Sequence, residues 1–190
     1  MLIYIHGFNS SALSFKAGLL RKRMAQCRRS DELLTPELPS EPRAAIELLD
    51  ALVTTNQPDV ALIGSSLGGY YATWLAERHC VRAVLINPAV RPYELLAEHL
   101  GLQMNLYTGA RYEFTREHVA ELRRLEVDHI TPERYLLMVQ TADEVLDYRH
   151  AVERYRGCEQ IVIEGGDHGF SDFDAYLDSA LRFCGYAEQR

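Results

Sequence analysis

The chain has 190 residues, of which 47% are hydrophobic and 25% are charged, and its formal net charge is −7 at pH 7. This length is enough for one domain with a sizeable core, and the composition is ordinary for a soluble globular protein. The negative charge disfavours nucleic acid as a partner, because phosphate binding needs a basic face. No apolar run approaches the ~20 residues of a membrane span, so we expect no membrane partner.

The first residues do not resemble a secretory signal. The apolar run Leu2 to Ile5 is too short for the hydrophobic region of a signal peptide. The four cysteines are widely spaced and form no C-x-x-C pair, which favours reduced thiols. A cytoplasmic location is therefore expected.

Apolar runs typical of strands alternate with amphipathic stretches typical of helices. The predicted strands are 2–5, 33–35, 60–63, 83–86, 135–139 and 160–163, and the predicted helices are 17–26, 43–55, 70–80, 148–155 and 173–183. The strands are continuous apolar runs, as a sheet covered on both faces requires. The alternation predicts an α/β fold with a parallel sheet between two layers of helices, in a single domain over 1–190.

Residues 89–134 interrupt this alternation. They contain two helical stretches, 93–100 and 115–125, separated by the segment 105–114. In a parallel sheet the active groups gather at the carboxyl ends of the strands. We therefore expect 89–134 to be a small helical cap inserted over that edge.

Gly64-Ser65-Ser66-Leu67-Gly68 lies between a predicted strand and a predicted helix. G-x-S-x-G in this context is the signature of a nucleophile elbow, a tight turn that holds the serine hydroxyl out of the fold. At the N-terminus of the helix, free amides and the helix dipole favour developing negative charge. The motif predicts that Ser66 is a nucleophile, and a plain strand–helix turn is the alternative.

A serine nucleophile needs a base and an acid that orients the base, in the chain order Ser, Asp or Glu, His. His168 follows the last predicted strand, between glycines, and is the expected base. Asp143 follows the strand 135–139 and is the expected acid. Glu144 and Asp147 are alternatives, although Asp147 fits better as a helix cap.

Two backbone amides are expected to form an oxyanion hole. One belongs to Leu67, directly after the predicted nucleophile. The other comes from the loop after the first strand, His6 to Ser11, where the Phe8 amide is the best candidate. His6 is expected to hold this loop by hydrogen bonds and not to act as the base.

Together these motifs resemble the α/β-hydrolase superfamily and, more narrowly, the small bacterial YqiA-type esterases. The resemblance spans nearly the whole chain and rests on the segments 3–11, 64–72, 85–90, 105–112 and 165–168. It implies an intracellular serine hydrolase that acts on esters or thioesters without a cofactor, with a triad of Ser66, Asp143 and His168. The chain begins at the strand before the oxyanion loop, so we expect a small sheet of about six to seven strands.

The expected reaction is hydrolysis of short to medium acyl esters through an acyl-enzyme, on a small-molecule substrate and with no metal. Tyr107, Tyr112 and Phe114 in the cap are candidates for lining an acyl pocket, or they pack the cap onto the core. An acyl-CoA thioesterase is the alternative, for which a basic site is needed, and arginines lie in or beside the cap at 91, 111, 116, 123 and 124. A non-catalytic binding protein on the same fold is the alternative from another class.

Overall fold

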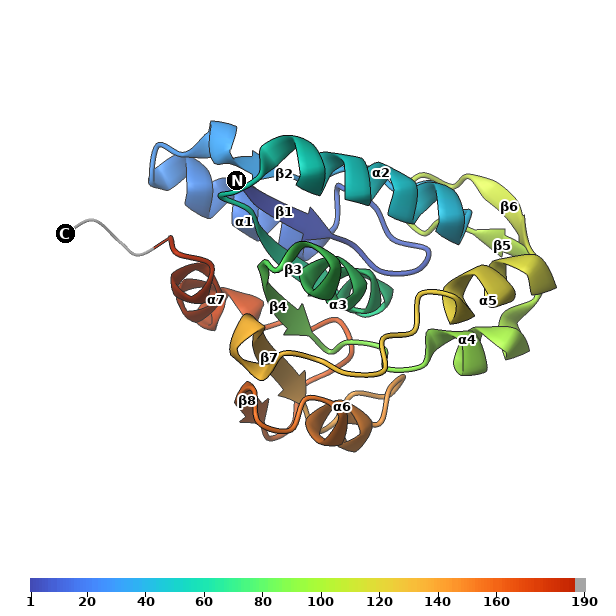
Figure 1. Cartoon of the computed structure of the whole chain (residues 1–190). Coiled ribbons are helices and arrows are strands. Elements are labelled where there is room, and N and C mark those ends of the chain that lie inside the picture. The colour runs from blue at the N-terminus through green and yellow to red at the C-terminus, as the bar shows by residue number, and fades with distance from the viewer. Residues whose placement is uncertain (187–190) are drawn as a thin grey trace.

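We describe residues 1–186 of the protein in a computed structural model, whose centre is a sheet of six strands (Figure 1). The strands are β1 (Leu2–Ile5), β2 (Leu33–Leu34), β3 (Ala61–Ser65), β4 (Arg82–Ile86), β7 (Tyr135–Gln140) and β8 (Glu159–Ile163). Their order is β2-β1-β3-β4-β7-β8, and every neighbouring pair is parallel. The predicted parallel sheet of about six to seven strands is therefore confirmed.

Helices cover both faces of this sheet (Figure 1). One hydrophobic cluster joins the sheet to α2 (Pro42–Asn56), α3 (Leu67–His79) and α6 (Tyr148–Arg154). A second cluster joins the opposite face to α1 (Phe15–Gln26) and α7 (Leu177–Phe183). Short 3₁₀ turns lie at Ser30–Glu32, Pro132–Arg134 and Phe173–Ala175.

The central strands are buried on both sides, which explains why they read as unbroken apolar runs. Every residue of β1 and of β7 is buried. Each large apolar side chain that is fully buried contributes about 1.5–3 kcal/mol relative to exposure. The sheet is therefore a rigid base for the loops at its carboxyl edge.

The segment between β4 and β7 lies beyond the carboxyl ends of the strands (Figure 1). It contains α4 (Pro92–Leu95), the 3₁₀ turn Leu96–His99, β5 (Gly101–Met104), β6 (Arg111–Phe114) and α5 (Arg116–Arg123). The helix predicted over 115–125 is confirmed as α5, whose N-cap Thr115 accepts a hydrogen bond from the His118 amide. The predicted helix over 93–100 is only two short turns.

The antiparallel hairpin β5–β6 was not expected. Its strands pair from Gly101 with Phe114 to Met104 with Arg111. Gly101 has a φ of +104°, a conformation that glycine adopts without strain and that ends the preceding turns. The cap is thus a mixture of short helices and one hairpin.

No helix within residues 1–186 combines the length and the apolarity of a membrane span.

Candidate active site

Ser66 occupies a strained turn between β3 and α3. Its backbone has φ +55° and ψ −121°, outside the regions that non-glycine residues favour. Glycines make the turn possible, since a Cβ on Gly68 would lie 2.1 Å from the Ile5 carbonyl oxygen, and one on Gly64 2.3 Å from the Gly68 carbonyl oxygen. The backbone geometry is that of a nucleophile elbow.

The side chain of His168 links Ser66 to Asp143. Its Nε2 lies 3.0 Å from the Ser66 hydroxyl oxygen. Its Nδ1 lies 2.8 Å from Oδ2 and 3.0 Å from Oδ1 of the Asp143 carboxylate. Three residues predicted from separate parts of the sequence thus form one hydrogen-bonded series, in the arrangement that a serine, a base and an orienting acid require.

Asp143 is held as a buried anion. Its side chain is 2% exposed, and Oδ1 accepts hydrogen bonds from the backbone amides of Val145 and Leu146 at 2.9 and 2.8 Å. Burial alone would raise the pKa of Asp143, but the hydrogen bond from His168 and the two amides outweigh it and hold the pKa below its usual value. The carboxylate therefore stays ionised next to the imidazole.

The two alternative acids have other partners. Glu144 accepts a hydrogen bond from the backbone amide of His168 at 2.9 Å, so it fixes the loop and does not meet the ring. Asp147 caps α6, where its side chain accepts from the Arg149 amide at 3.0 Å. The interpretation of Asp147 as a helix cap is confirmed.

The loop after β1 passes close to the elbow. A Cβ on Gly7 would lie 3.1 Å from the Ser66 Cβ, so only glycine lets the backbone come this near without a shift. Leu67 is the first residue of α3, where the amide has no partner within the helix. No residue in the described range 1–186 accepts a hydrogen bond from the Phe8 amide.

His6 anchors this loop. Its side chain is 5% exposed, Nδ1 lies 3.0 Å from the Gly7 carbonyl oxygen, and Nε2 accepts from the Leu38 amide at 3.2 Å. Burial lowers the pKa of His6, so the ring stays neutral and bridges two loops. It lies outside the series formed by Ser66, His168 and Asp143.

The three aromatic residues of the cap have different surroundings. Phe114 is 1% exposed and packs edge-on against Phe8, with 5.3 Å between the ring centroids. This contact joins the hairpin to the loop after β1. The Tyr112 hydroxyl donates to Asn9 Oδ1 at 2.7 Å. Tyr107 is 49% exposed. The position of Phe114 fits the packing alternative, whereas Tyr112 faces a cavity.

That cavity has a volume of about 420 Å³ and lies beside the elbow. Its walls come from the loop after β1, the segment 37–40, the start of α3 and the hairpin, with Gly7, Phe8, Leu67 and Tyr112 among the lining residues. Both residues predicted for the oxyanion hole therefore border it. The cavity lies within the size range of small-molecule sites.

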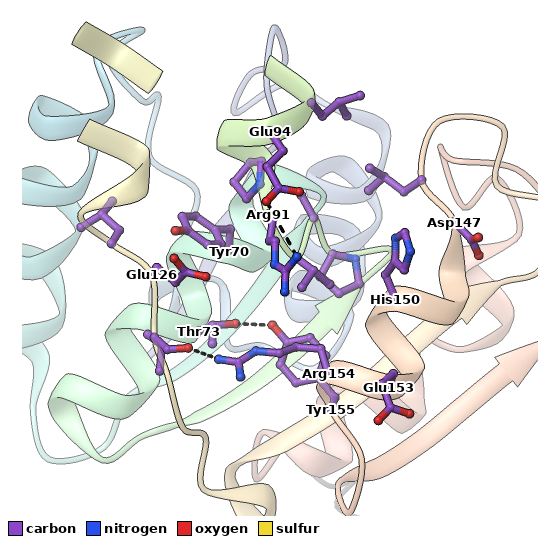
Figure 2. A pocket seen from close by; sticks show the side chains of 18 of the residues that line it. Tyr70, Thr73, Arg91, Glu94, Glu126, Asp147, His150, Glu153, Arg154 and Tyr155 are labelled. Atoms are coloured by element: carbon purple, nitrogen blue, oxygen red, sulfur yellow. Dashed lines mark hydrogen bonds and ion pairs between the residues drawn. The ribbon is translucent and has the colours of Figure 1, made fainter. Parts of the chain in front are cut away.

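A larger cavity of about 760 Å³ lies between the cap, α3 and α6 (Figure 2). Figure 2 shows Arg91 facing Glu94 and the hydrogen bond between Thr73 and Tyr155, whose oxygens are 2.7 Å apart. Its acidic lining residues are Glu94, Glu98, Glu126, Asp128, Asp147 and Glu153, against Arg91 and Arg154. Neither cavity has Ser66 or His168 in its wall. The larger cavity is bordered by Val145 and Leu146, whose amides donate to Asp143.

Two polar residues near His168 were missed in the sequence. Asn87 and Gln140 are 3% and 0% exposed, and both bind the backbone of the loop that carries the histidine. In the sequence, Asn87 only followed a predicted strand within one segment of the family resemblance, and Gln140 only followed another predicted strand; neither was assigned a role. No local pattern distinguishes a buried polar residue at a strand end from an exposed one.

Within residues 1–186, no group of three or more His, Cys, Asp or Glu side chains is arranged to hold a metal ion.

Solved structures with the same fold cover nearly all of this chain. A putative hydrolase from Agrobacterium vitis matches with a TM-score of 0.71 and 19% identity over 96% of this chain and 87% of its own. The esterase domain of a Rhodothermus marinus protein matches at 0.60 and 18%, over 97% and 85%. A monoacylglycerol lipase from Paleococcus ferrophilus matches at 0.64 and 14%, over 98% and 94%. A mouse protein described as alpha/beta hydrolase domain-containing protein 10 also matches, at 0.64 and 17% over 97% and 86%, so the fold is that of the α/β-hydrolases.

Comparison of sequences identifies a narrower family than comparison of folds does. A protein of Citrobacter koseri described as a UPF0227 protein is 26% identical over 96% of this chain and 98% of its own. The model of the family described as "Uncharacterised protein family (UPF0227)" matches residues 1–185. Since that match takes in nearly the entire sequence, the chain belongs to the UPF0227 family, as the resemblance to YqiA-type proteins predicted.

Proposed function

We propose that this protein is a serine esterase that hydrolyses short to medium acyl esters through an acyl-enzyme. One observation carries the proposal: His168 is within hydrogen-bond distance of both the Ser66 hydroxyl and the Asp143 carboxylate. A hydroxyl with an adjacent base, itself oriented by a buried carboxylate, is the arrangement that activates serine for attack on carbonyl carbon. Several proteins of the same fold are described as esterases or lipases, which supports this reaction class.

The first half of the reaction acylates the serine. Ser66 Oγ attacks the ester carbonyl carbon while its proton passes to His168 Nε2, and the carbonyl π electrons move onto oxygen. The tetrahedral intermediate then collapses, the C–O bond to the alcohol breaks, and the alcohol leaves with the proton from Nε2. Asp143 stabilises the imidazolium that exists between these two transfers.

The second half releases the acid. Water replaces the alcohol, gives its proton to His168 Nε2 and attacks the acyl carbon. The second tetrahedral intermediate breaks the bond to Ser66 Oγ, which takes back the proton. The amides of Phe8 and Leu67 are the proposed donors to the oxyanion in both halves, and loss of one such donor typically costs about 3 kcal/mol.

The cavity beside the elbow suits the acyl group of a small ester. Its volume is about 420 Å³, and its lining includes Phe8 and Leu67, the proposed oxyanion-hole residues, which supports this role. Tyr112 from the hairpin closes one side and is the proposed substrate-binding residue among the cap aromatics. Tyr107 and Phe114 lie outside the lining of this cavity.

Simple esters fit this protein better than acyl-CoA, the alternative substrate. The 3′-phosphate and diphosphate of CoA need a basic site, yet the larger cavity has six carboxylates against two guanidinium groups. Arg91 pairs with Glu94 at 3.8 Å, and Arg123 lies over the Tyr93 ring. Arg111 alone of the five arginines borders the smaller cavity.

The test compares p-nitrophenyl esters of graded acyl length with the matching acyl-CoA thioesters. For Ser66→Ala we expect turnover to fall by roughly 10⁴-fold or more, because the covalent step is lost. Ser30→Ala is the matched control, since Ser30 is exposed in a turn after α1. A fluorophosphonate probe should add its mass to the wild type and to the control, but not to Ser66→Ala.

Each outcome decides between the alternatives. Wild-type turnover in Ser66→Ala would eliminate the mechanism. A saturable preference for acyl-CoA over the matching simple ester would replace the esterase with a thioesterase on the same residues. A wild type that turns over none of these substrates and does not react with the probe would favour a binding protein on a hydrolase fold.

A further inference from the structure

The loop that carries His168 is held by side chains from other strands and not by secondary structure of its own. It follows β8 and turns through two glycines, Gly165 and Gly166, with φ +81° and +80°. Residues 167 and 168 nevertheless have all four of their backbone N–H and C=O groups within hydrogen-bond distance of side-chain atoms. Such contacts determine where the backbone of the histidine lies.

Asn87 provides the central contact. It follows β4 with a φ of +39°, a conformation that asparagine tolerates better than most residues. Its Nδ2 donates to the carbonyl oxygens of Asp167 at 3.0 Å and of His168 at 3.2 Å. Its Oδ1 accepts from the Gln140 amide at 3.0 Å. One side chain therefore connects β4, β7 and the histidine loop.

Gln140 provides a second contact, from the end of β7. Its Oε1 accepts from the Asp167 amide at 2.9 Å, and its Nε2 donates to Asp172 Oδ1 at 2.5 Å. The loop lies directly on this side chain, since a Cβ on Gly166 would be 2.1 Å from the Gln140 Cδ. Gln140 is fully buried, so loss of its amide would leave loop groups without a partner.

We propose that Asn87 and Gln140 are positioning residues that fix the His168 imidazole between Ser66 and Asp143. This inference rests on the proposed function. Neither side chain touches a reacting atom, so both act through the histidine. The imidazole must meet two partners at about 3 Å at the same time, and a displacement of ~1 Å in an active site can cost ~10²-fold in rate. A loop freed from Asn87 and Gln140 would sample such displacements.

The first variant is Asn87→Asp, which removes the Nδ2 donor while it keeps an oxygen for the Gln140 amide and nearly the same volume. We expect kcat to fall 10- to 100-fold with KM within about twofold of wild type, because the histidine is displaced and the substrate contacts are not. Gln140→Met is the second variant, with the same expectation, and it decides the question if Asn87→Asp does not fold. Asn56→Asp is the matched control, since the Asn56 side chain also donates to a backbone carbonyl, that of Leu52, within α2.

A double-mutant cycle separates positioning from a general structural role. In a His168→Ala background, Asn87→Asp should change the residual rate of fluorophosphonate labelling of Ser66 by less than twofold, because the positioned group is gone. If Asn87→Asp lowers the labelling rate in the His168→Ala background by the same factor as in the wild-type background, the inference is overturned. Unchanged kcat in both Asn87→Asp and Gln140→Met would also overturn it. If Ser66→Ala and His168→Ala themselves keep full turnover, then it is the proposed function that has failed.

Discussion

The ammonium group of Lys16 is buried and contacts the loop that carries His168. Lys16 extends from α1, is 9% exposed, and donates to the Gly169 carbonyl oxygen at 2.5 Å. Burial lowers the pKa of Lys16 to about 8 from its ordinary 10.5, although the carboxylates of Asp167 and Asp143 oppose the shift. A buried lysine that is still charged at neutral pH lowers the stability of the folded protein, and this one lies at the edge of the candidate site.

The cost of Lys16 should be visible as a pH dependence of stability. Below pH 8 the group is charged in both states, so the folded protein bears the full desolvation penalty. Between pH 8 and 10.5 the unfolded chain holds more protons than the folded protein, so the free energy of unfolding gains up to about 3 kcal/mol from this residue as pH rises. Above 10.5 both states are neutral and the gain is complete.

Urea unfolding of Lys16→Met at pH 7 and pH 10 tests this sign. The free energy of unfolding of the wild type, relative to that of the variant, should be higher at pH 10 than at pH 7. Lys22→Met is the control, because Lys22 is exposed on the same helix and should show no such change. An equal difference at both pH values would mean that Lys16 is not desolvated in the folded state.

At the scale of elements, the hairpin β5–β6 is joined to the loop after β1 by several polar contacts. Asn105 Nδ2 donates to the Ser10 carbonyl oxygen at 2.7 Å, and the Leu106 amide donates to that of Asn9 at 2.9 Å. The Tyr112 hydroxyl donates to Asn9 Oδ1. The loop that carries the Phe8 amide is therefore positioned by the cap as well as by β1.

Removal of the Tyr112 hydroxyl should therefore impair the proposed reaction while the fold is kept. A side-chain hydrogen bond of this kind contributes about 1 kcal/mol, so we expect Tyr112→Phe to lower kcat/KM for p-nitrophenyl esters by roughly fivefold. Tyr107→Phe is the control, because it removes the same group from the half-exposed tyrosine of the same hairpin. Equal kcat/KM in Tyr112→Phe and wild type would show that the bond to Asn9 does not position the loop for the reaction.

The same hairpin shows where sequence patterns stop being informative. The core strands were predictable because burial on both faces makes them unbroken apolar runs, and the helices were predictable because burial on one face imposes a helical period. In the hairpin, Leu102 and Met104 lie on the exposed side of β5, so apolarity does not mark the buried face. Such a segment is defined by its contacts with residues 8–10, which lie far away in the sequence.

The candidate site was predictable for a related reason and with the same limit. Ser66, Asp143 and His168 each follow a strand in a characteristic local context, and strand order brings those contexts together. Asn87 follows β4 and Gln140 ends β7, but what distinguishes these two residues is the loop they bind, and that loop is 27 or more residues away. Contacts of this kind are visible only once the sheet has been assembled.

At the scale of the whole molecule, we expect the six-stranded sheet and the β5–β6 hairpin to differ in stability. The adjacent strands β3, β4 and β7 are covered by helices on both faces and carry Ser66, Asn87 and Gln140 at their carboxyl ends. The β5–β6 hairpin is a separate two-stranded sheet, and such hairpins are marginal by themselves in water. It depends on packing such as that of Phe114 against Phe8.

We therefore expect the hairpin to open without global unfolding. In hydrogen exchange followed by mass spectrometry at increasing urea, peptides that cover 101–114 should exchange at lower urea than peptides that cover 61–65 and 82–86, because local opening exposes little surface and costs less free energy. Ester turnover should decline in the same range of urea as the hairpin opens, since Tyr112 and the loop after β1 move with it. Loss of protection in all three segments at one urea concentration would contradict this and would make the hairpin part of the same cooperative unit as the sheet.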